Sequence, residues 1–247
     1  GGNYAFTLPV GGFVQPLASG GLPENPETKR RFRNLIELSG LSKDLTILSA
    51  RRANVDELLR VHTKKYIKDF MSLSENGGGE LGRQVPFGPG GFDMACRSAG
   101  LVVSAVESVL SGNLKNAYAL SRPPGHHCLP DIPNGFCLLN NIAIAVRSAQ
   151  ANRLVERVAI IDWDVHHGNG TEAIFYDDPN VLTISIHQER NYPLDTGAFA
   201  DRGEEKGFGY NLNIPLPPGS GDQSYLEVMK RLVEPAVDLF HPDLIII

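Results

Sequence analysis

Four short apolar runs, rich in β-branched residues, constrain the fold of this chain more than any other feature. They occupy residues 116–123, 157–164, 180–187 and 243–247. Segments with helical periodicity lie among them, at 139–152, 170–176 and 224–240. Strands that are buried on both faces and alternate with helices form a mainly parallel sheet. We therefore expect an α/β fold whose helices cover both faces of the sheet.

The first half of the chain is more helical. Helical periodicity predicts helices over 28–41 and 53–74, the second capped by Asn54. Residues 76–91 contain seven glycines and two prolines, which predicts a long loop. The small and apolar residues of 92–112 predict a well-buried helix.

Composition limits the classes of protein that this chain resembles. Its 247 residues, 42% hydrophobic, suffice for one core, so we expect a single domain over 1–247. A formal net charge of -5 gives no basic footprint for nucleic acid. Three cysteines without CxxC spacing indicate a reducing compartment, and we expect a cytoplasmic protein. No apolar stretch approaches the roughly 18 residues that span a bilayer, so we expect no membrane partner.

The two ends of the sequence suggest that it is part of a longer protein. It begins "GGNYAF" without an initiating Met, and it ends "HPDLIII", an apolar run like the interior of a strand. We therefore expect the domain to be truncated, with its C-terminal part missing.

Polar residues follow two of the predicted strands. The first strand leads into "SRPPGHHCLPDIPNGFC", with His126 and His127, and the second ends in "DWDVHHGNG", with His166 and His167. In open parallel sheets the chemistry collects beyond the carboxyl ends of the strands. We expect these two histidine pairs to meet there.

The second strand end has the composition of a metal site. Asp162, Asp164 and His166 alternate, so in an extended segment they project to the same side. Three polar groups there are costly to bury unless a cation or hydrogen-bond partner meets them. Zinc takes Asp oxygen and His nitrogen readily. The structural alternative is that the aspartates cap the following turn and the histidines belong to the core; we expect packing or hydrogen bonding for His167.

The His126–His127 pair has the composition of an acid–base site. The prolines and glycine of "RPPGHH" stiffen the turn and hold both imidazoles. A neutral imidazole can take the proton of a metal-bound water, and a carboxylate on the far ring nitrogen fixes its tautomer. Asp162 is well placed to be that carboxylate. Taken alone, adjacent histidines also fit an ordinary surface turn.

Several motifs resemble one superfamily, in its order and at its spacing: "HTKKYI", "ALSRPPGHH", "GFCLLNNIAIA", "IIDWDVHHGNGTEAIFY", "VLTISIH" and "GYNLNIPLPPG". The chain is similar to the histone deacetylase and acetylpolyamine amidohydrolase superfamily, in its class II-like branch of bacterial histone deacetylase-like amidohydrolases. The likeness runs from about residue 60 onward; "ENPETKRRF" is a weaker match near the start. It implies an arginase/deacetylase-like fold and a zinc-dependent amidohydrolase that removes acetyl or related acyl groups from lysine-like or polyamine amines.

The resemblance also assigns roles to individual residues. Asp164 and His166 correspond to zinc ligands, and the third ligand and the oxyanion-stabilising residue would lie beyond Ile247. His126 and His127 correspond to the tandem histidines, with His127 as the general base and acid. Asp162 backs His126, and Asn169 stands behind His127, where class I relatives have an aspartate that would make the imidazole more basic.

The resemblance further implies a substrate tunnel and bound cations. Phe136 would form one tunnel wall, Gly135 would accept the substrate amide, and Tyr192 lies where the facing aromatic wall is usual. Potassium is expected at two sites, largely through carbonyl oxygens. The matching positions are Asp162, Asp164, His166, Ser185 and Ile186 for one site, and Phe175, Asp178, Val181 and Tyr210 for the other.

Three other functions compete with this interpretation. One is a non-catalytic remnant of the same fold that only binds an acylated ligand. Another is an arginase-type dinuclear ureohydrolase, although "DVHHGN" lacks the second aspartate that two metals require. The third is a plain structural α/β domain. The identity of the acylated amine and homo-oligomerisation are left open by the sequence.

Overall fold

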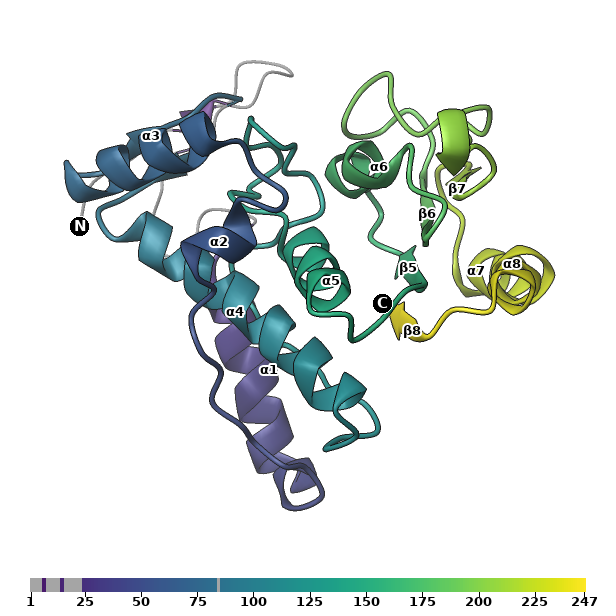
Figure 1. Cartoon of the computed structure of the whole chain (residues 1–247), viewed down its shortest axis with the longest axis horizontal. Helices are drawn as coiled ribbons and strands as arrows, with labels where there is room; N and C mark the ends of the chain where they lie inside the picture. The colour runs from purple at the N-terminus through teal and green to yellow at the C-terminus, as the bar shows by residue number, and fades with distance from the viewer. Residues whose placement is uncertain (1–5, 8–13, 16–23, 84) are drawn as a thin grey trace.

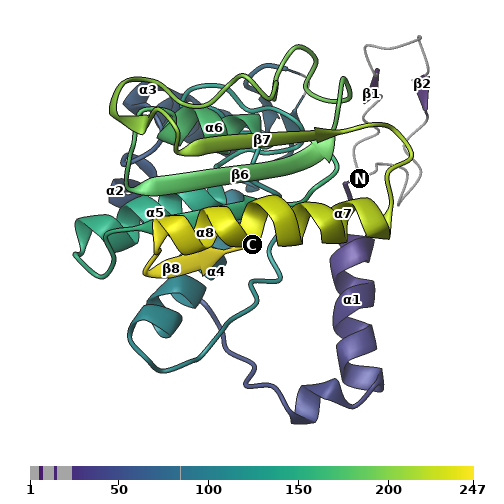
Figure 2. The same cartoon turned by 90° about the vertical axis from the view of Figure 1, so that its right-hand side faces the viewer.

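A four-stranded parallel sheet is the centre of the molecule. The computed structural model describes residues 6–7, 14–15, 24–83 and 85–247. The sheet has the order β7-β6-β5-β8, and all three pairings are parallel. Figure 2 shows β7 and β6 side by side. Its strands are β5 (Val158–Asp162), β6 (Val181–Gln188), β7 (Asn211–Leu216) and β8 (Leu244–Ile246). The expected parallel α/β fold is confirmed, as are the strands predicted within 157–164, 180–187 and 243–247.

Helices cover both faces of this sheet. On one side lie α5 (Asn141–Ala151) and α6 (Asn169–Phe175), with α4 (Gly91–Leu110) packed along α5 (Figure 1). On the other side lie α7 (Asp222–Val228) and α8 (Glu234–Phe240). Side chains of β5 alternate between the two cores: Val158 and Ile160 pack with α4 and α5, and Ala159 and Ile161 pack with α8. Each fully buried Val or Ile contributes about 1.5–3 kcal/mol, so both faces stabilise the sheet.

The remaining elements are short or peripheral. They are α1 (Pro26–Leu38), α2 (Val55–Leu58), α3 (Lys64–Glu75), the 3-10 turns η1 (Leu41–Lys43) and η2 (Glu205–Gly207), and the strand pairs β1 (Phe6–Thr7) with β2 (Val14–Gln15) and β3 (Gly79–Glu80) with β4 (Pro86–Phe87). The pair β3 and β4 lies inside the predicted loop 76–91, which is therefore partly a hairpin. Among the described residues, no helix combines the length and apolarity needed to cross a bilayer.

The strand predicted over 116–123 is wrong. These residues belong to no helix or strand, and the Ser121 N–H donates to the carbonyl of Ala119 at 2.8 Å in a local turn. A strand is stable only where a neighbouring strand supplies its hydrogen bonds. No described strand pairs with this segment.

The helix predicted over 53–74 is two helices, α2 and α3. The Asn54 cap is confirmed: its side chain accepts from the Glu57 N–H at 3.0 Å, and Glu57 accepts in return from the Asn54 N–H at 2.8 Å. The helix ends after Leu58 because a second cap follows within the same apolar pattern. Thr63 starts α3 by accepting from the Tyr66 N–H, and its own N–H donates to the Pro130 carbonyl at 3.0 Å.

The helix predicted over 224–240 is continuous but not uniform. A π-helical turn over Met229–Val233 joins α7 to α8, and Pro235 follows at the start of α8. Proline has no N–H and its ring clashes with the carbonyl four residues earlier, so a wider turn before it accommodates both problems. The sequence interpretation missed β7, although the apolar residues of "NLNIPL" alternate as they do in a strand.

Between α2 and α3 lies His62, a buried anchor for the loop that carries the tandem histidines. It is 2% exposed; its Nδ1 lies 3.2 Å from the Pro130 carbonyl oxygen, and its Nε2 accepts from the Asn140 N–H at 3.0 Å. This geometry requires a neutral imidazole, since Nε2 is an acceptor. Burial lowers the pKa of His62 from 6.5 to about 4, although the backbone carbonyl opposes the shift.

We expect His62 to make the fold acid-sensitive. The unfolded chain binds its proton below about pH 6.5, and the folded chain resists it until about pH 4, so the stability is present above pH 6.5 and lost as the pH falls towards 4. The loss amounts to up to about 3 kcal/mol. Urea unfolding from pH 7.5 to 4.5 should show a smaller decline for His62→Gln than for the unmodified protein. Equal declines would contradict this origin of the acid sensitivity.

Candidate active site

Two histidine-bearing segments meet at the carboxyl edge of the sheet. The carbonyl of His126 accepts from the N–H groups of Gly170 and Thr171, at 2.9 and 3.1 Å. These donors belong to the first turn of α6, whose N–H groups lack partners within the helix. A Cβ on Gly170 would lie 2.4 Å from the Cys128 carbonyl oxygen, so only glycine allows this approach. The sequence predicts that the two histidine-bearing segments meet, and they do, although the first of them does not follow a strand.

His126 is paired with a carboxylate. Its Nδ1 lies 2.7 Å from Asp162 Oδ2, and both side chains are 14% exposed. Burial lowers the pKa of His126, but the charge and hydrogen bond of Asp162, together with the charge of Asp164, outweigh burial, and the net pKa is raised. The pair therefore favours a protonated imidazole held by its carboxylate.

His127 is paired with an amide. Its Nδ1 lies 2.9 Å from Asn169 Oδ1, and the imidazole is 3% exposed. An amide oxygen is an acceptor, so Nδ1 carries the proton and Nε2 keeps a free lone pair. Burial, followed by the charge on His126 at a ring distance of 3.9 Å, lowers the pKa of His127 to about 3. The pKa values of the two adjacent imidazoles are thus shifted in opposite directions.

Asp164 and His166 lie past the end of β5, and their alternation is not that of an extended strand. The chain bends after Asp162 because each carboxylate accepts from the backbone two residues on: Asp162 from the Asp164 N–H at 3.1 Å and Asp164 from the His166 N–H at 2.8 Å. The expectation that all three side chains project to one side of an extended segment is therefore wrong. The bend still joins Asp164 Oδ1 to His166 Nδ1, at 2.9 Å.

The donor pair fits zinc in kind but not in number. Asp164 and His166 side chains are 49% and 40% exposed, so a ligand can reach both. Burial raises the pKa of Asp164, but the His166 hydrogen bond and the His126 charge bring it down to about 2, so the carboxylate is ionised. Catalytic zinc usually has three protein ligands. In the described part of the chain, no three His, Cys, Asp or Glu side chains group so as to hold a metal ion.

Two of the predicted substrate residues, Gly135 and Tyr192, pack against His127. Gly135 and Phe136 are the central residues of a tight turn, with φ of 50° and 66°. A Cβ on Gly135 would lie 2.2 Å from His127 Cδ2, so the turn packs directly on that ring. Tyr192 stands edge-on to His127, with ring centres 5.1 Å apart and planes at 87°. Burial raises the pKa of Tyr192, which keeps its hydroxyl protonated.

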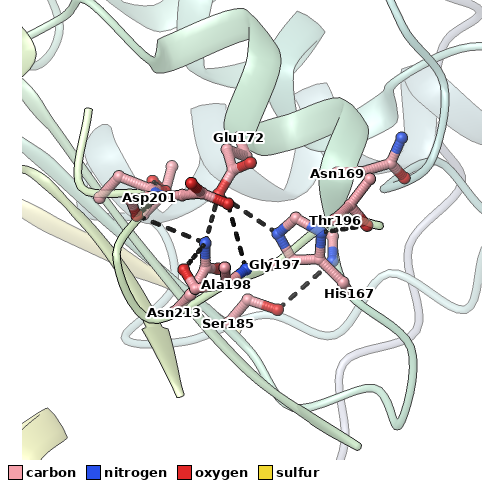
Figure 3. Close-up of polar contacts among 12 residues, drawn as sticks. His167, Asn169, Glu172, Ser185, Thr196, Gly197, Ala198, Asp201 and Asn213 are labelled. Atoms are coloured by element: carbon pink, nitrogen blue, oxygen red, sulfur yellow. Dashed lines mark hydrogen bonds and ion pairs between the residues drawn. The ribbon is translucent and has the colours of Figure 1, made fainter. Parts of the chain in front are cut away.

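A buried polar network behind the site was not predicted (Figure 3). Its centre is Glu172 on α6, whose Oε2 accepts from Asn211 and Asn213 on β7, at 2.7 and 2.6 Å. His167 is 1% exposed; its Nε2 faces the same oxygen at 3.3 Å, and its Nδ1 lies 3.0 Å from Thr196 Oγ1. The expected packing or hydrogen bonding of His167 is confirmed. The available signal was the Asn-x-Asn of "GYNLNIP", which places two amides on one face of a strand.

The network fastens the loop after Tyr192 to the sheet. Asn211 Nδ2 donates to the Asp201 carbonyl at 2.8 Å, and His187 Nε2 lies 2.9 Å from the Gly197 carbonyl oxygen. Burial raises the pKa of Glu172, but His167 and the two amides outweigh burial and hold it below the usual value.

The residues expected to bind potassium lie along β5, β6 and the turns beside them. Ser185 Oγ accepts from the Gly168 N–H at 3.3 Å. The carbonyls of Phe175 and Asp178 accept from the N–H groups of Asp178 and Val181, at 3.0 and 3.3 Å, and that of Tyr210 accepts from Thr183 at 2.9 Å. Both cation sites, the first of which includes the Ile186 carbonyl, stay predictions.

Fold and site together define an α/β protein of the arginase/deacetylase-like type. The chain belongs to the histone deacetylase family, since the model of the histone deacetylase domain matches residues 22–247.

Individual relatives agree with this membership. The chain is 52% identical over 246 residues to the histone deacetylase-like amidohydrolase of Pseudomonas aeruginosa, covering 100% of this chain and 65% of that protein. It is 41% identical over 230 residues to a probable deacetylase of Archaeoglobus fulgidus, covering 91% of this chain and 63% of that protein. The crystal structure of the HDA15 HD domain superposes with a TM-score of 0.88 at 33% identity, over 98% of this chain and 69% of that one. The chain thus spans under two thirds of the length of both sequence relatives.

We expect Glu172 to be a large contributor to stability. Replacing it with Ala leaves two buried amides and the His167 imidazole without their shared acceptor, which should lower the free energy of unfolding by about 2–4 kcal/mol. Glu227→Ala is the matched control, since Glu227 pairs with Arg231 on an exposed helix face and should change stability by less than about 0.5 kcal/mol. Denaturant unfolding measures both; equal effects would contradict the role of the network.

Proposed function

We propose that the protein containing this chain is a zinc-dependent amidohydrolase that removes acetyl or related acyl groups from lysine-like or polyamine amines. Family membership supports the reaction class. The observation that carries the proposal is the pair of imidazoles 3.9 Å apart, of which one is held by a carboxylate and the other by an amide. Two such imidazoles can take different roles: the one held by a carboxylate carries charge, and the one held by an amide accepts a proton.

His127 is the proposed general base and acid. Asn169 holds the proton on Nδ1, so Nε2 is free to take a proton from the attacking water. The same nitrogen then returns that proton to the departing amine. An amide behind the ring makes His127 less basic than a carboxylate would, and its neutral form is thereby favoured at neutral pH.

His126 and Asp162 are proposed to stabilise charge. A protonated His126 beside the reacting carbonyl opposes the negative charge that develops in the transition state. The Asp162 carboxylate keeps that proton in place and fixes the ring, at an Nδ1 to Oδ2 distance of 2.7 Å. These residues therefore act by position and charge, whereas His127 moves the proton.

Asp164 and His166 are the proposed zinc ligands. Zinc in such a site supplies Lewis-acid polarisation of the acyl carbonyl. Potassium beside β5 and β6 is part of the same proposal, by likeness to the family. Acetyl-lysine on protein and acetylpolyamines are the proposed substrate classes. The ureohydrolase alternative requires a second aspartate for two metals, which "DVHHGN" lacks.

We expect His127→Ala to reduce turnover of a fluorogenic acetyl-lysine substrate by at least about 10²-fold, because the proton acceptor is lost. Zinc content, measured by mass spectrometry, should be unchanged, since His127 is not a proposed ligand. His241→Asn is the control, at an exposed position far along the chain on the C-terminal cap of α8. Retained turnover in His127→Ala would overturn the assignment of the base. Zinc binding without hydrolysis by the unmodified protein would favour a non-catalytic binding function.

A further inference from the structure

Asn134 occupies a rigid position beside the paired imidazoles, and the proposed mechanism does not use it. Its N–H donates to the Cys137 carbonyl at 3.2 Å, and its carbonyl accepts from the Cys137 N–H at 2.8 Å. This closes the two-residue turn over Gly135 and Phe136, whose positive φ angles are those of tight hairpin turns. The side chain of Asn134 is buried, with the residue 3% exposed. The stretch of backbone that carries this amide is therefore fixed.

The amide oxygen of Asn134 holds the tip of the Tyr192 ring. The Tyr192 hydroxyl donates to Asn134 Oδ1 at 2.6 Å. The ring stands edge-on to both His127 and His166, with centre distances of 5.1 and 5.9 Å. Tyr192 is thus placed against the proposed base and a proposed zinc ligand at once.

The backbone of Tyr192 is fixed by a separate set of contacts. Its carbonyl accepts from the His167 N–H at 3.1 Å, and the following residues are fastened by Thr196 and Gly197 to the network around Glu172 (Figure 3). A Cβ on Gly135 would lie 3.0 Å from Tyr192 Cε1, so the ring already packs against the turn. The ring is therefore confined on the side of the turn.

The other end of the Asn134 amide does not stabilise the fold. Its Nδ2 is buried and has no hydrogen-bond partner among the described residues. A buried unpaired N–H costs stability. The amide of Asn134 thus contacts another side chain through its hydrogen bond to Tyr192. This bond indicates that Asn134 has a role at the site.

We propose that Asn134 is a positioning residue that fixes the Tyr192 ring and so limits the size of the acyl group that the site accepts. The inference rests on the proposed function, since it names which acylated amines that site takes. With the ring held edge-on to His127 and His166, we expect the acyl group that reaches the imidazoles to be limited to acetyl. With the ring released, that space admits propionyl and butyryl.

Fluorogenic peptides with acetyl-, propionyl- and butyryl-lysine test this proposal. Asn134→Ala and Tyr192→Phe should each raise the ratio of kcat/KM for butyryl over acetyl by about tenfold, the size of effect that one or two methylenes produce in a pocket. The double variant should not exceed either single variant, because both remove the same bond. Asn134→Asp replaces the unpaired Nδ2 by a second oxygen of an ionisable carboxyl group but keeps an acceptor for the Tyr192 hydroxyl, so it should preserve the ratio. Tyr118→Phe, at an exposed tyrosine, is the control.

Folding is followed in parallel. In urea, the double variant should unfold at the same midpoint as Tyr192→Phe, independently of any activity. Additive losses of stability, or an unchanged acyl ratio in variants that still hydrolyse acetyl-lysine, overturn the inference alone. An unmodified protein that hydrolyses none of the three peptides overturns the proposed function, and the acyl selectivity with it.

Discussion

The hydrogen bonds from the first turn of α6 to the His126 carbonyl are the contact on which the site depends. They join a loop near the middle of the sequence to the segment after β5, at N to O distances of 2.9 and 3.1 Å. Helix N–H groups need an acceptor, and the carbonyl provides it. Once these two segments touch, His126 faces Asp162 and His127 faces Asn169.

A second set of contacts places the outer wall of the site. Glu172, also on α6, holds the amides of Asn211 and Asn213, and these in turn bind the loop that follows Tyr192. The first turn of one short helix therefore positions both the proposed acid–base residues and, through Glu172, the loop after Tyr192. Because the same helix rests on the sheet, disturbance of either group of contacts reaches both.

The sequence predicts what depends on local pattern. Strands of β-branched residues and the Asn54 cap follow from periodicity and local capping. The two histidine pairs do meet as predicted, but through the His126 carbonyl and α6 rather than through two parallel strands. Prediction from sequence fails where the local structure depends on a contact with another part of the molecule. Residues 116–123 have a strand-like composition but no described neighbour, and the chain after Asp162 bends because carboxylates bind its backbone. The Asn134 to Tyr192 bond joins residues 58 apart, which no local pattern reveals.

At Phe136, the residue that would give the most stable backbone differs from the residue that the proposed function requires. Its φ of 66° is one that a bulky residue adopts at a cost of about 1–3 kcal/mol, and that glycine adopts freely. Selection for thermal stability alone would favour glycine there. A sequence designed only to optimise this backbone would therefore fold more firmly and lose the ring that is proposed to form one tunnel wall.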